Sequence, residues 1–198
     1  MTTSDDLTFA QVQEALGVSD RVLKQWIDYG VLHPLRKDGR ISYFSRASLW
    51  NLTKLHDKLQ EPRLETGTPE RSLRLLVVDD DPFFLDLFAL YADSWPVPVT
   101  LTTANNGFEG LVLIGQNRPD VVVSDLCMPG MDGFQMLRRL RGAGAAYANL
   151  KFVVVTALSA GDIKDKGGLP SGIEVLFKPV KFEKIQSAVC NATSMQFF

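Results

Sequence analysis

The chain has 198 residues, of which 45% are apolar, and a formal net charge of −2. That length allows one large domain or two small ones, and the near-neutral charge gives no argument from bulk charge for a nucleic-acid partner. No apolar run reaches the roughly 18 residues that a membrane-spanning helix needs, and the polar start MTTSDDLTF does not fit a secretory signal. Two cysteines, Cys127 and Cys190, make no disulfide framework. We expect a globular, cytoplasmic protein with no membrane partner.

The first 60 residues predict a small helical module with a hairpin between its second and third helices. Thr8 is a plausible cap for a short first helix, and Gly17 to Ser19 predict a tight turn. Ser19 then caps a second helix, which Gly30 ends. Two helices joined by a short turn form a helix-turn-helix. Asp38-Gly39 lies between two short strand-like runs and predicts a hairpin, after which Ser45 caps a third helix, Arg46 to Leu59.

The order ALGVS, LKQWIDYGVL and GRISYFSRASL resembles the winged helix-turn-helix of the mercury-resistance regulator (MerR) and phage excisionase families. The resemblance implies DNA binding, with the second helix in the major groove and the hairpin wing on phosphate. Six Arg or Lys against two Asp between Arg21 and Arg46 suit a phosphate track. The candidate DNA contacts are Arg21, Lys24, Gln25, Arg36, Lys37 and Arg40. The alternative is a solvated face of a small helical module. Trp26 is expected in the core, and Tyr43 either contacts the DNA backbone or packs.

The segment Gln60 to Ser72 is polar, with two prolines and one glycine, and predicts a linker. We therefore divide the chain into a winged module at 1–60, a linker at 61–72 and a second domain at 73–198. The early Pro62 leaves no room for the long dimerisation helix of the mercury-type regulators.

Beyond the linker, five strand-like segments alternate with helical ones. The expected strands are Leu73–Val78, Val97–Ala104, Val121–Val123, Phe152–Thr156 and Glu174–Phe177. The expected helices are Pro82–Asp93, Gly107–Gln116, Gly133–Arg141 and Lys181–Ala192. This alternation predicts an α/β domain, a parallel sheet with helices on both faces. The segment Ser159 to Gly172 holds four glycines and a proline, so its helix should be short or irregular.

Acidic side chains follow two of the expected strands. Asp79, Asp80 and Asp81 come after the first strand, and Asp125 comes after the third. The carboxyl ends of parallel strands share one edge of the sheet, so these acids should meet there and repel each other unless a cation joins them. Hard oxygen ligands suit Mg²⁺. Taken singly, such an acid is more often a helix cap or turn residue, and Asp81 before Pro82 could be only such a cap.

The other strand ends supply groups suited to phosphoryl transfer. Thr156 ends the fourth strand, and Lys178 follows the fifth. Asp125 would act as a carboxylate nucleophile, while Lys178 and a metal neutralise phosphoryl oxygens and the Thr156 hydroxyl donates to one of them. A packing threonine and a solvated lysine are the alternatives for these two residues.

The motifs LLVVDDDP, VVVSDLCMPGMDGF, VVVTALS and FKPV resemble the receiver domain of two-component response regulators over residues 73–192. The resemblance implies a (βα)5 flavodoxin-like fold and phosphorylation of Asp125 by a histidine kinase or phosphotransfer protein. It also implies that Asp80 and Asp125 bind Mg²⁺ directly, with the Cys127 backbone carbonyl as third ligand and Asp79 acting through water. Thr156 and Lys178 would contact the phosphoryl group. Val175 departs from the pattern, since the family usually has an aromatic residue there.

These observations predict a response regulator in which phosphorylation of Asp125 controls an N-terminal DNA-binding module. Such a protein is no enzyme beyond self-catalysed phosphotransfer and dephosphorylation, and it could form a homodimer. The alternative is a signalling adaptor whose winged module binds a protein. A metal-dependent phosphatase is a weaker hypothesis, because neither a substrate pocket nor a second general acid is recognisable.

Overall fold

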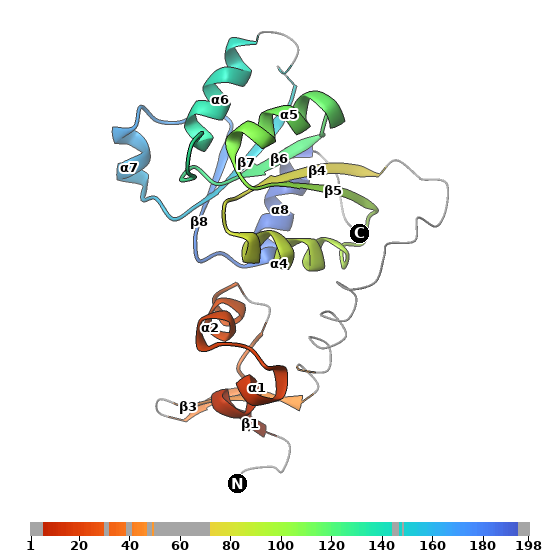
Figure 1. Ribbon diagram of the computed structural model, residues 1–198, viewed down its shortest axis with the longest axis vertical. Helices are drawn as coiled ribbons and strands as arrows, with labels where there is room; N and C mark the ends of the chain where they lie inside the picture. The colour runs from red at the N-terminus through yellow and green to blue at the C-terminus, as the bar shows by residue number, and fades with distance from the viewer. Residues whose placement is uncertain are drawn as a thin grey trace. The chain divides into compact units, whose positions relative to one another are not determined.

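The computed structural model describes residues 6–29, 32–38, 41–46, 49, 72–143, 147 and 149–193, without the side chains of Gln25 and Asp38. The chain divides into two compact units, Met1–Thr66 and Gly67–Phe198 (Figure 1). Four expectations lie wholly or mainly outside the described residues: the Gly30 helix end, the third helix, the linker before Ser72 and residue Arg40.

The N-terminal unit contains the expected helix-turn-helix. Its helices are α1 (Phe9–Leu16) and α2 (Asp20–Asp28). The Thr8 side chain accepts from the Gln11 backbone N–H and closes a capping box, and the Ser19 hydroxyl accepts from the Val22 N–H at 3.4 Å. Gly17 ends α1 with a φ of 65°, a left-handed conformation that glycine adopts without a steric cost. Both predicted caps and the turn between them are therefore confirmed.

The predicted hairpin belongs to a sheet of three strands. β2 (Arg36–Asp38) pairs antiparallel with β3 (Ile41–Ser45), and β1 (Asp6–Thr8) pairs with the other edge of β3. We did not expect β1 from the sequence, since three residues are too short to show a strand period. The unit's core gathers Val12, Leu23, Leu32, Phe44 and Leu49, and half-buried Trp26 packs against it as predicted.

The C-terminal unit is built on a parallel sheet in the order β5-β4-β6-β7-β8. The strands are β4 (Leu73–Val78), β5 (Val99–Ala104), β6 (Val121–Ser124), β7 (Lys151–Thr156) and β8 (Glu174–Phe177). The helices are α4 (Pro82–Ala92), α5 (Gly107–Asn117), α6 (Gly133–Gly142), α7 (Ala160–Asp165) and α8 (Phe182–Thr193). α5 and α6 cover one face of the sheet, and α4 and α8 cover the other (Figure 1). The predicted doubly covered α/β fold is confirmed.

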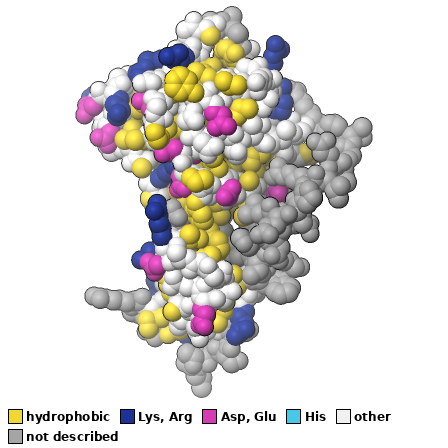
Figure 2. Space-filling view, in the orientation of Figure 1, with side chains coloured by type: hydrophobic (Ala, Val, Ile, Leu, Met, Phe, Trp, Pro, Cys, Tyr) yellow, Lys and Arg dark blue, Asp and Glu magenta, His cyan; other side chains and the backbone are white. Residues whose placement is uncertain are grey.

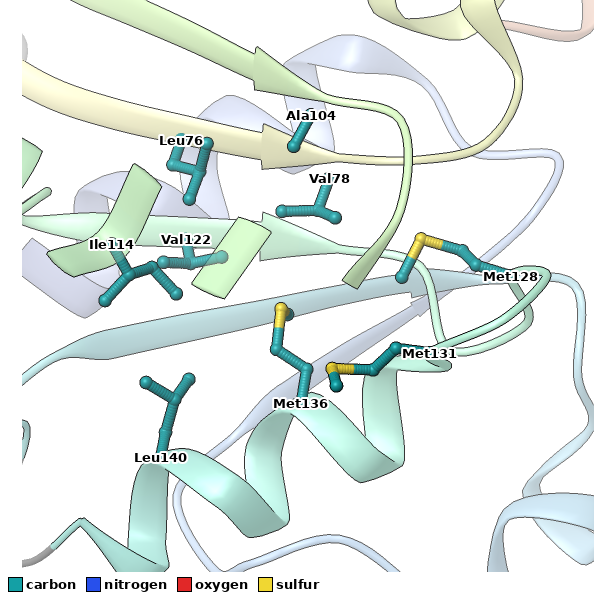
Figure 3. Close-up of a cluster of buried hydrophobic side chains, with 9 residues drawn as sticks. All are labelled: Leu76, Val78, Ala104, Ile114, Val122, Met128, Met131, Met136 and Leu140. Carbon is teal, nitrogen blue, oxygen red and sulfur yellow. The ribbon is translucent and has the colours of Figure 1, made fainter. Parts of the chain in front are cut away.

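Each face of this sheet has its own core. Under α5 and α6, aliphatic and methionine side chains interlock, among them Leu76 of β4, Ile114 of α5 and Met136 of α6 (Figure 3). On the other face the core is aromatic. It contains Phe84, Phe88 and Tyr91 of α4, Trp95 just after α4, and Phe182 of α8, with neighbouring ring centroids 5.2–6.5 Å apart.

The segment from Ser159 to Gly172 forms only a short helix, as predicted. α7 has six residues and begins with a capping box between Ser159 and Asp162. Gly167 and Gly168 then take left-handed φ values, which end the helix, and Gly172 takes another one further along the loop. Val175 of β8 is half-buried and packs against the cluster that includes Ile163 of α7. Within the part of the chain that the structure describes, no helix is long and apolar enough to span a membrane.

Candidate functional site

The residues that directly follow β4 and β6 are both aspartates, and each still donates a backbone hydrogen bond to the neighbouring strand. The Asp125 N–H donates to the Val78 carbonyl at 2.9 Å, and the Asp79 N–H donates to the Ala104 carbonyl at 3.1 Å. Because β4 and β6 are neighbours in the sheet, Asp79 and Asp125 emerge together at its carboxyl edge. The predicted meeting of these acids is confirmed.

Lys178 bridges the two carboxylates. Its Nζ lies 2.6 Å from Asp79 Oδ2 and 2.9 Å from Asp125 Oδ2. The three side chains are only 14%, 1% and 7% exposed, so these charges are largely removed from water. The Lys178 N–H donates to the Thr156 carbonyl at 2.7 Å, which ties the loop after β8 to the end of β7, and the Lys178–Pro179 peptide is cis. The sequence-predicted lysine therefore lies among the sequence-predicted acids.

The donor atoms at this edge fit a hard divalent cation. Asp79, Asp80 and Asp125 can each offer one carboxylate oxygen, and these oxygens lie within 4.8 Å of one another. Asp80 is exposed, so the cluster opens to solvent on that side. Carboxylate oxygens with room for water are the ligands that Mg²⁺ prefers. Asp81 is the N-cap of α4, since its Oδ1 accepts from the Phe83 N–H at 3.0 Å.

Burial and neighbouring charge set the protonation of the cluster. Burial raises the pKa of Asp79 to about 6, against the opposing effect of the Lys178 ammonium. Burial alone would lower the pKa of Lys178, but the Asp79 and Asp125 carboxylates outweigh it and hold that pKa above its usual value. Two buried acids thus share one ammonium, which leaves a deficit of positive charge that a bound cation would fill.

The loop after β6 fixes the Asp125 carboxylate. Its Oδ1 accepts the backbone N–H groups of Leu126 and of Cys127, the latter at 3.0 Å, while its Oδ2 faces Lys178. Gly133 allows this loop to lie against α6, because a Cβ at that position would stand 2.2 Å from the Asp125 carbonyl oxygen. Sequence reasoning missed Gly133, although MDGF gives a signal in the form of a glycine at the start of a helix.

Thr156 lies at the end of β7 and is fully buried. Its Oγ1 accepts from the Leu158 N–H at 3.3 Å, so the hydroxyl proton is left to donate elsewhere. Cys127 is exposed.

The candidate DNA contacts of the N-terminal unit divide into exposed and engaged side chains. Arg21 and Lys37 are exposed, and Lys24 forms a solvent-exposed ion pair with Asp20. Arg36 is engaged with Asp6 and Tyr43. The Gln25 side chain and Arg40 lie outside the described residues.

Arg36 braces the three-stranded sheet through contacts with residues of the other two strands. Its guanidinium carbon lies 4.0 Å above the centre of the Tyr43 ring, and its Nε lies 3.2 Å from Asp6 Oδ2. Arg36 and Tyr43 are direct partners on β2 and β3, and Asp6 lies on β1, so the contact crosses all three strands. Tyr43 therefore packs beneath an arginine, and the Asp6 carboxylate, 8% exposed, is covered.

Each of the two units matches a known protein family. Residues 75–190 match the family model of the response regulator receiver domain, and residues 7–61 match that of the MerR HTH family regulatory proteins. The chain is 29% identical over 129 residues to a probable C4-dicarboxylate response regulator, DctR, of Priestia megaterium, covering 64% of this chain and 54% of that protein. It is 35% identical over 118 residues to the DNA-binding dual master transcriptional regulator RpaA of Synechocystis sp., covering 59% of this chain and 47% of that protein.

A solved structure gives the same result. The receiver domain of Francisella response regulator 1452 superposes with a TM-score of 0.53 and 29% identity, covering 62% of this chain and 98% of that one. The chain belongs to the response regulator receiver domain family, and its N-terminal unit carries a match to the MerR helix-turn-helix family. Proteins of the receiver family bind Mg²⁺ at an acidic pocket and are phosphorylated by histidine kinases. The chain spans about half the length of the two curated relatives described above.

Proposed function

We propose that the protein is a response regulator in which phosphorylation of Asp125 controls DNA binding by the N-terminal unit. The observation that carries this proposal is the Asp125 carboxylate at the sheet edge, held beside Asp79 and within 2.9 Å of the Lys178 ammonium, in a chain of the receiver family. The phosphoryl donor would be a histidine kinase or a phosphotransfer protein.

The acidic cluster would hold the metal. We assign Asp80, Asp125 and the Cys127 backbone carbonyl as direct Mg²⁺ ligands, and Asp79 as a ligand through water. When bound, Mg²⁺ would supply positive charge against the phosphoryl oxygens. This assignment is supported by the three clustered carboxylate oxygens and by the uncompensated charge of two buried acids around one lysine.

The chain's own residues would position and complete the transfer. An Asp125 carboxylate oxygen attacks phosphorus, a phosphorus–oxygen bond forms, and the bond from phosphorus to the donor's imidazole nitrogen breaks. Oδ2 is the better placed oxygen, because Oδ1 already accepts two backbone N–H groups. Lys178 then donates to a phosphoryl oxygen, and the buried Thr156 hydroxyl donates to another. Later attack of water on phosphorus breaks the bond from phosphorus to the Asp125 oxygen, releases inorganic phosphate and returns the free carboxylate.

The N-terminal unit, with residue 60 as its expected boundary and 61–72 as its linker, would read DNA. The match to the MerR helix-turn-helix family and the two capped helices support insertion of α2 into the major groove. Of the candidate contacts, Arg21, Lys24, Gln25, Lys37 and Arg40 would reach the DNA directly, whereas Arg36 would act through the sheet it braces.

A salt titration of DNA binding tests this proposal. The full chain would be measured by fluorescence anisotropy against genomic DNA fragments, with and without beryllofluoride and Mg²⁺, together with its mass in solution. We expect binding that weakens as salt rises and that changes on beryllofluoride addition, with or without formation of a homodimer. Absence of binding at low salt in both states would instead support a signalling adaptor whose winged unit binds a protein.

A further inference from the structure

Lys178 has a third neighbour besides its two carboxylates. Its Nζ lies 4.8 Å from the centre of the Phe84 ring, over the ring face. Phe84 belongs to the first turn of α4 and is 1% exposed. An ammonium within about 6 Å of an aromatic ring centre is attracted to the electron-rich face, most strongly where water is excluded.

The Phe84 ring is itself fixed by the aromatic core. Phe182 of α8 stacks on it with a centroid distance of 5.7 Å and an interplanar angle of 20°. Phe88, one turn further along α4, meets it edge-on at 6.0 Å. A ring held by two other rings has little freedom to turn away, so its face is a fixed feature of the site.

We propose that Phe84 is a positioning residue for the phosphoryl-binding lysine, an inference that rests on the proposed function of Lys178. The ammonium has three N–H donors, and two of them are directed to Asp79 and Asp125. The ring attracts the charge without competing as a strong hydrogen-bond acceptor. It therefore holds the ammonium at the sheet edge while leaving a donor for a phosphoryl oxygen.

An aliphatic side chain of similar size could fill the same volume but would offer no such attraction. The charge of Lys178 would then be held only by the two carboxylates, and both of those are themselves expected to turn toward a metal. The ring would therefore hold the Lys178 ammonium in place when the carboxylates turn toward the metal. At that stage Lys178 must stay within reach of the incoming phosphoryl group.

A graded fluorination of Phe84 tests this inference. Mono-, di- and trifluorinated phenylalanine at position 84 withdraw electron density from the ring face while nearly preserving its shape and burial. With acetyl phosphate and Mg²⁺, we expect the rate of Asp125 phosphorylation to fall stepwise, by about 5- to 30-fold at the last step. Trp95→Leu is the matched control. It removes a ring of the same core whose neighbouring rings are Phe88 and Tyr91, so it should lower the melting temperature and leave the rate near that of the wild type.

A second measurement reads the contact without phosphorylation. The ε-methylene protons of Lys178, assigned by comparison with Lys178→Arg, should show an upfield ring-current shift in the wild type that disappears in Phe84→Leu. A flat rate across the fluorinated series, or the same methylene shift in wild type and Phe84→Leu, overturns the inference. A wild type that acetyl phosphate does not modify would overturn the proposed function instead, while the methylene shift would still decide whether the ring holds the lysine.

Discussion

The protonation of Asp79 should make the metal-free protein lose stability as pH rises. The pKa of this carboxyl is raised from 3.8 to about 6, chiefly by burial. A folded-state pKa above the unfolded value means that the folded chain binds more protons between these pH values, so its stability falls as pH rises through that window. A shift of about two pKa units corresponds to about 3 kcal/mol, which the metal-free protein loses between pH 4 and pH 7 at this one group.

Other carboxyls also titrate in this range, so the Asp79 contribution is isolated by a difference. Urea unfolding of the wild type and of Asp79→Asn, both in chelator, would be followed from pH 4 to pH 7. We expect the wild type to lose about 3 kcal/mol relative to the variant across this range, because asparagine does not titrate. Saturating Mg²⁺ should abolish the loss. A difference that is independent of pH, or that grows in favour of the wild type, would refute the reasoning.

Three further predictions follow from the same contacts. Lys178→Met leaves two buried carboxylates without their ammonium, so in chelator at pH 7 it should lower the free energy of unfolding in urea by about 3–5 kcal/mol, and that stability should recover at pH 5. An unchanged free energy of unfolding would contradict this. Gly133→Ala places a Cβ against the Asp125 carbonyl, so it should lower the free energy of unfolding by about 1–3 kcal/mol and slow phosphorylation by acetyl phosphate. Wild-type stability together with a wild-type rate would contradict this prediction. Lys37→Ala should lower the salt dependence of DNA binding by about one phosphate contact, whereas Arg36→Ala should lower the melting temperature of the N-terminal unit. Equal salt slopes and equal melting temperatures for the two variants would contradict the structural role of Arg36.

The receiver fold could be predicted from the sequence because its strands are short apolar runs bounded by acids, glycines and prolines. Val121–Val123 is an example, since the three valines are buried and the strand extends only one residue further, to Ser124. β1 could not be predicted, because Asp6–Thr8 becomes a strand only by pairing with β3, far along the chain.

The meeting of Asp79, Asp125 and Lys178 could be predicted because alternating strands and helices indicate a parallel sheet, and parallel strands place their carboxyl ends at one edge. The engagement of Arg36 could not, because nothing in the sequence indicates that Asp6, 30 residues earlier, pairs with it across a sheet. The contact of Phe84 with Lys178 was missed for a similar reason. A phenylalanine at helical spacing predicts a core position, and only the fold shows which charge lies over its ring.

The most direct test of the account is the site of phosphorylation itself. The full chain would be treated with acetyl phosphate and Mg²⁺, reduced with borohydride, which converts an aspartyl phosphate to homoserine, and digested for mass spectrometry. The account predicts homoserine at position 125, dependent on Mg²⁺ and absent in Asp125→Asn. Homoserine at Asp80 or Asp81 instead, or no conversion in the folded wild type, would contradict it.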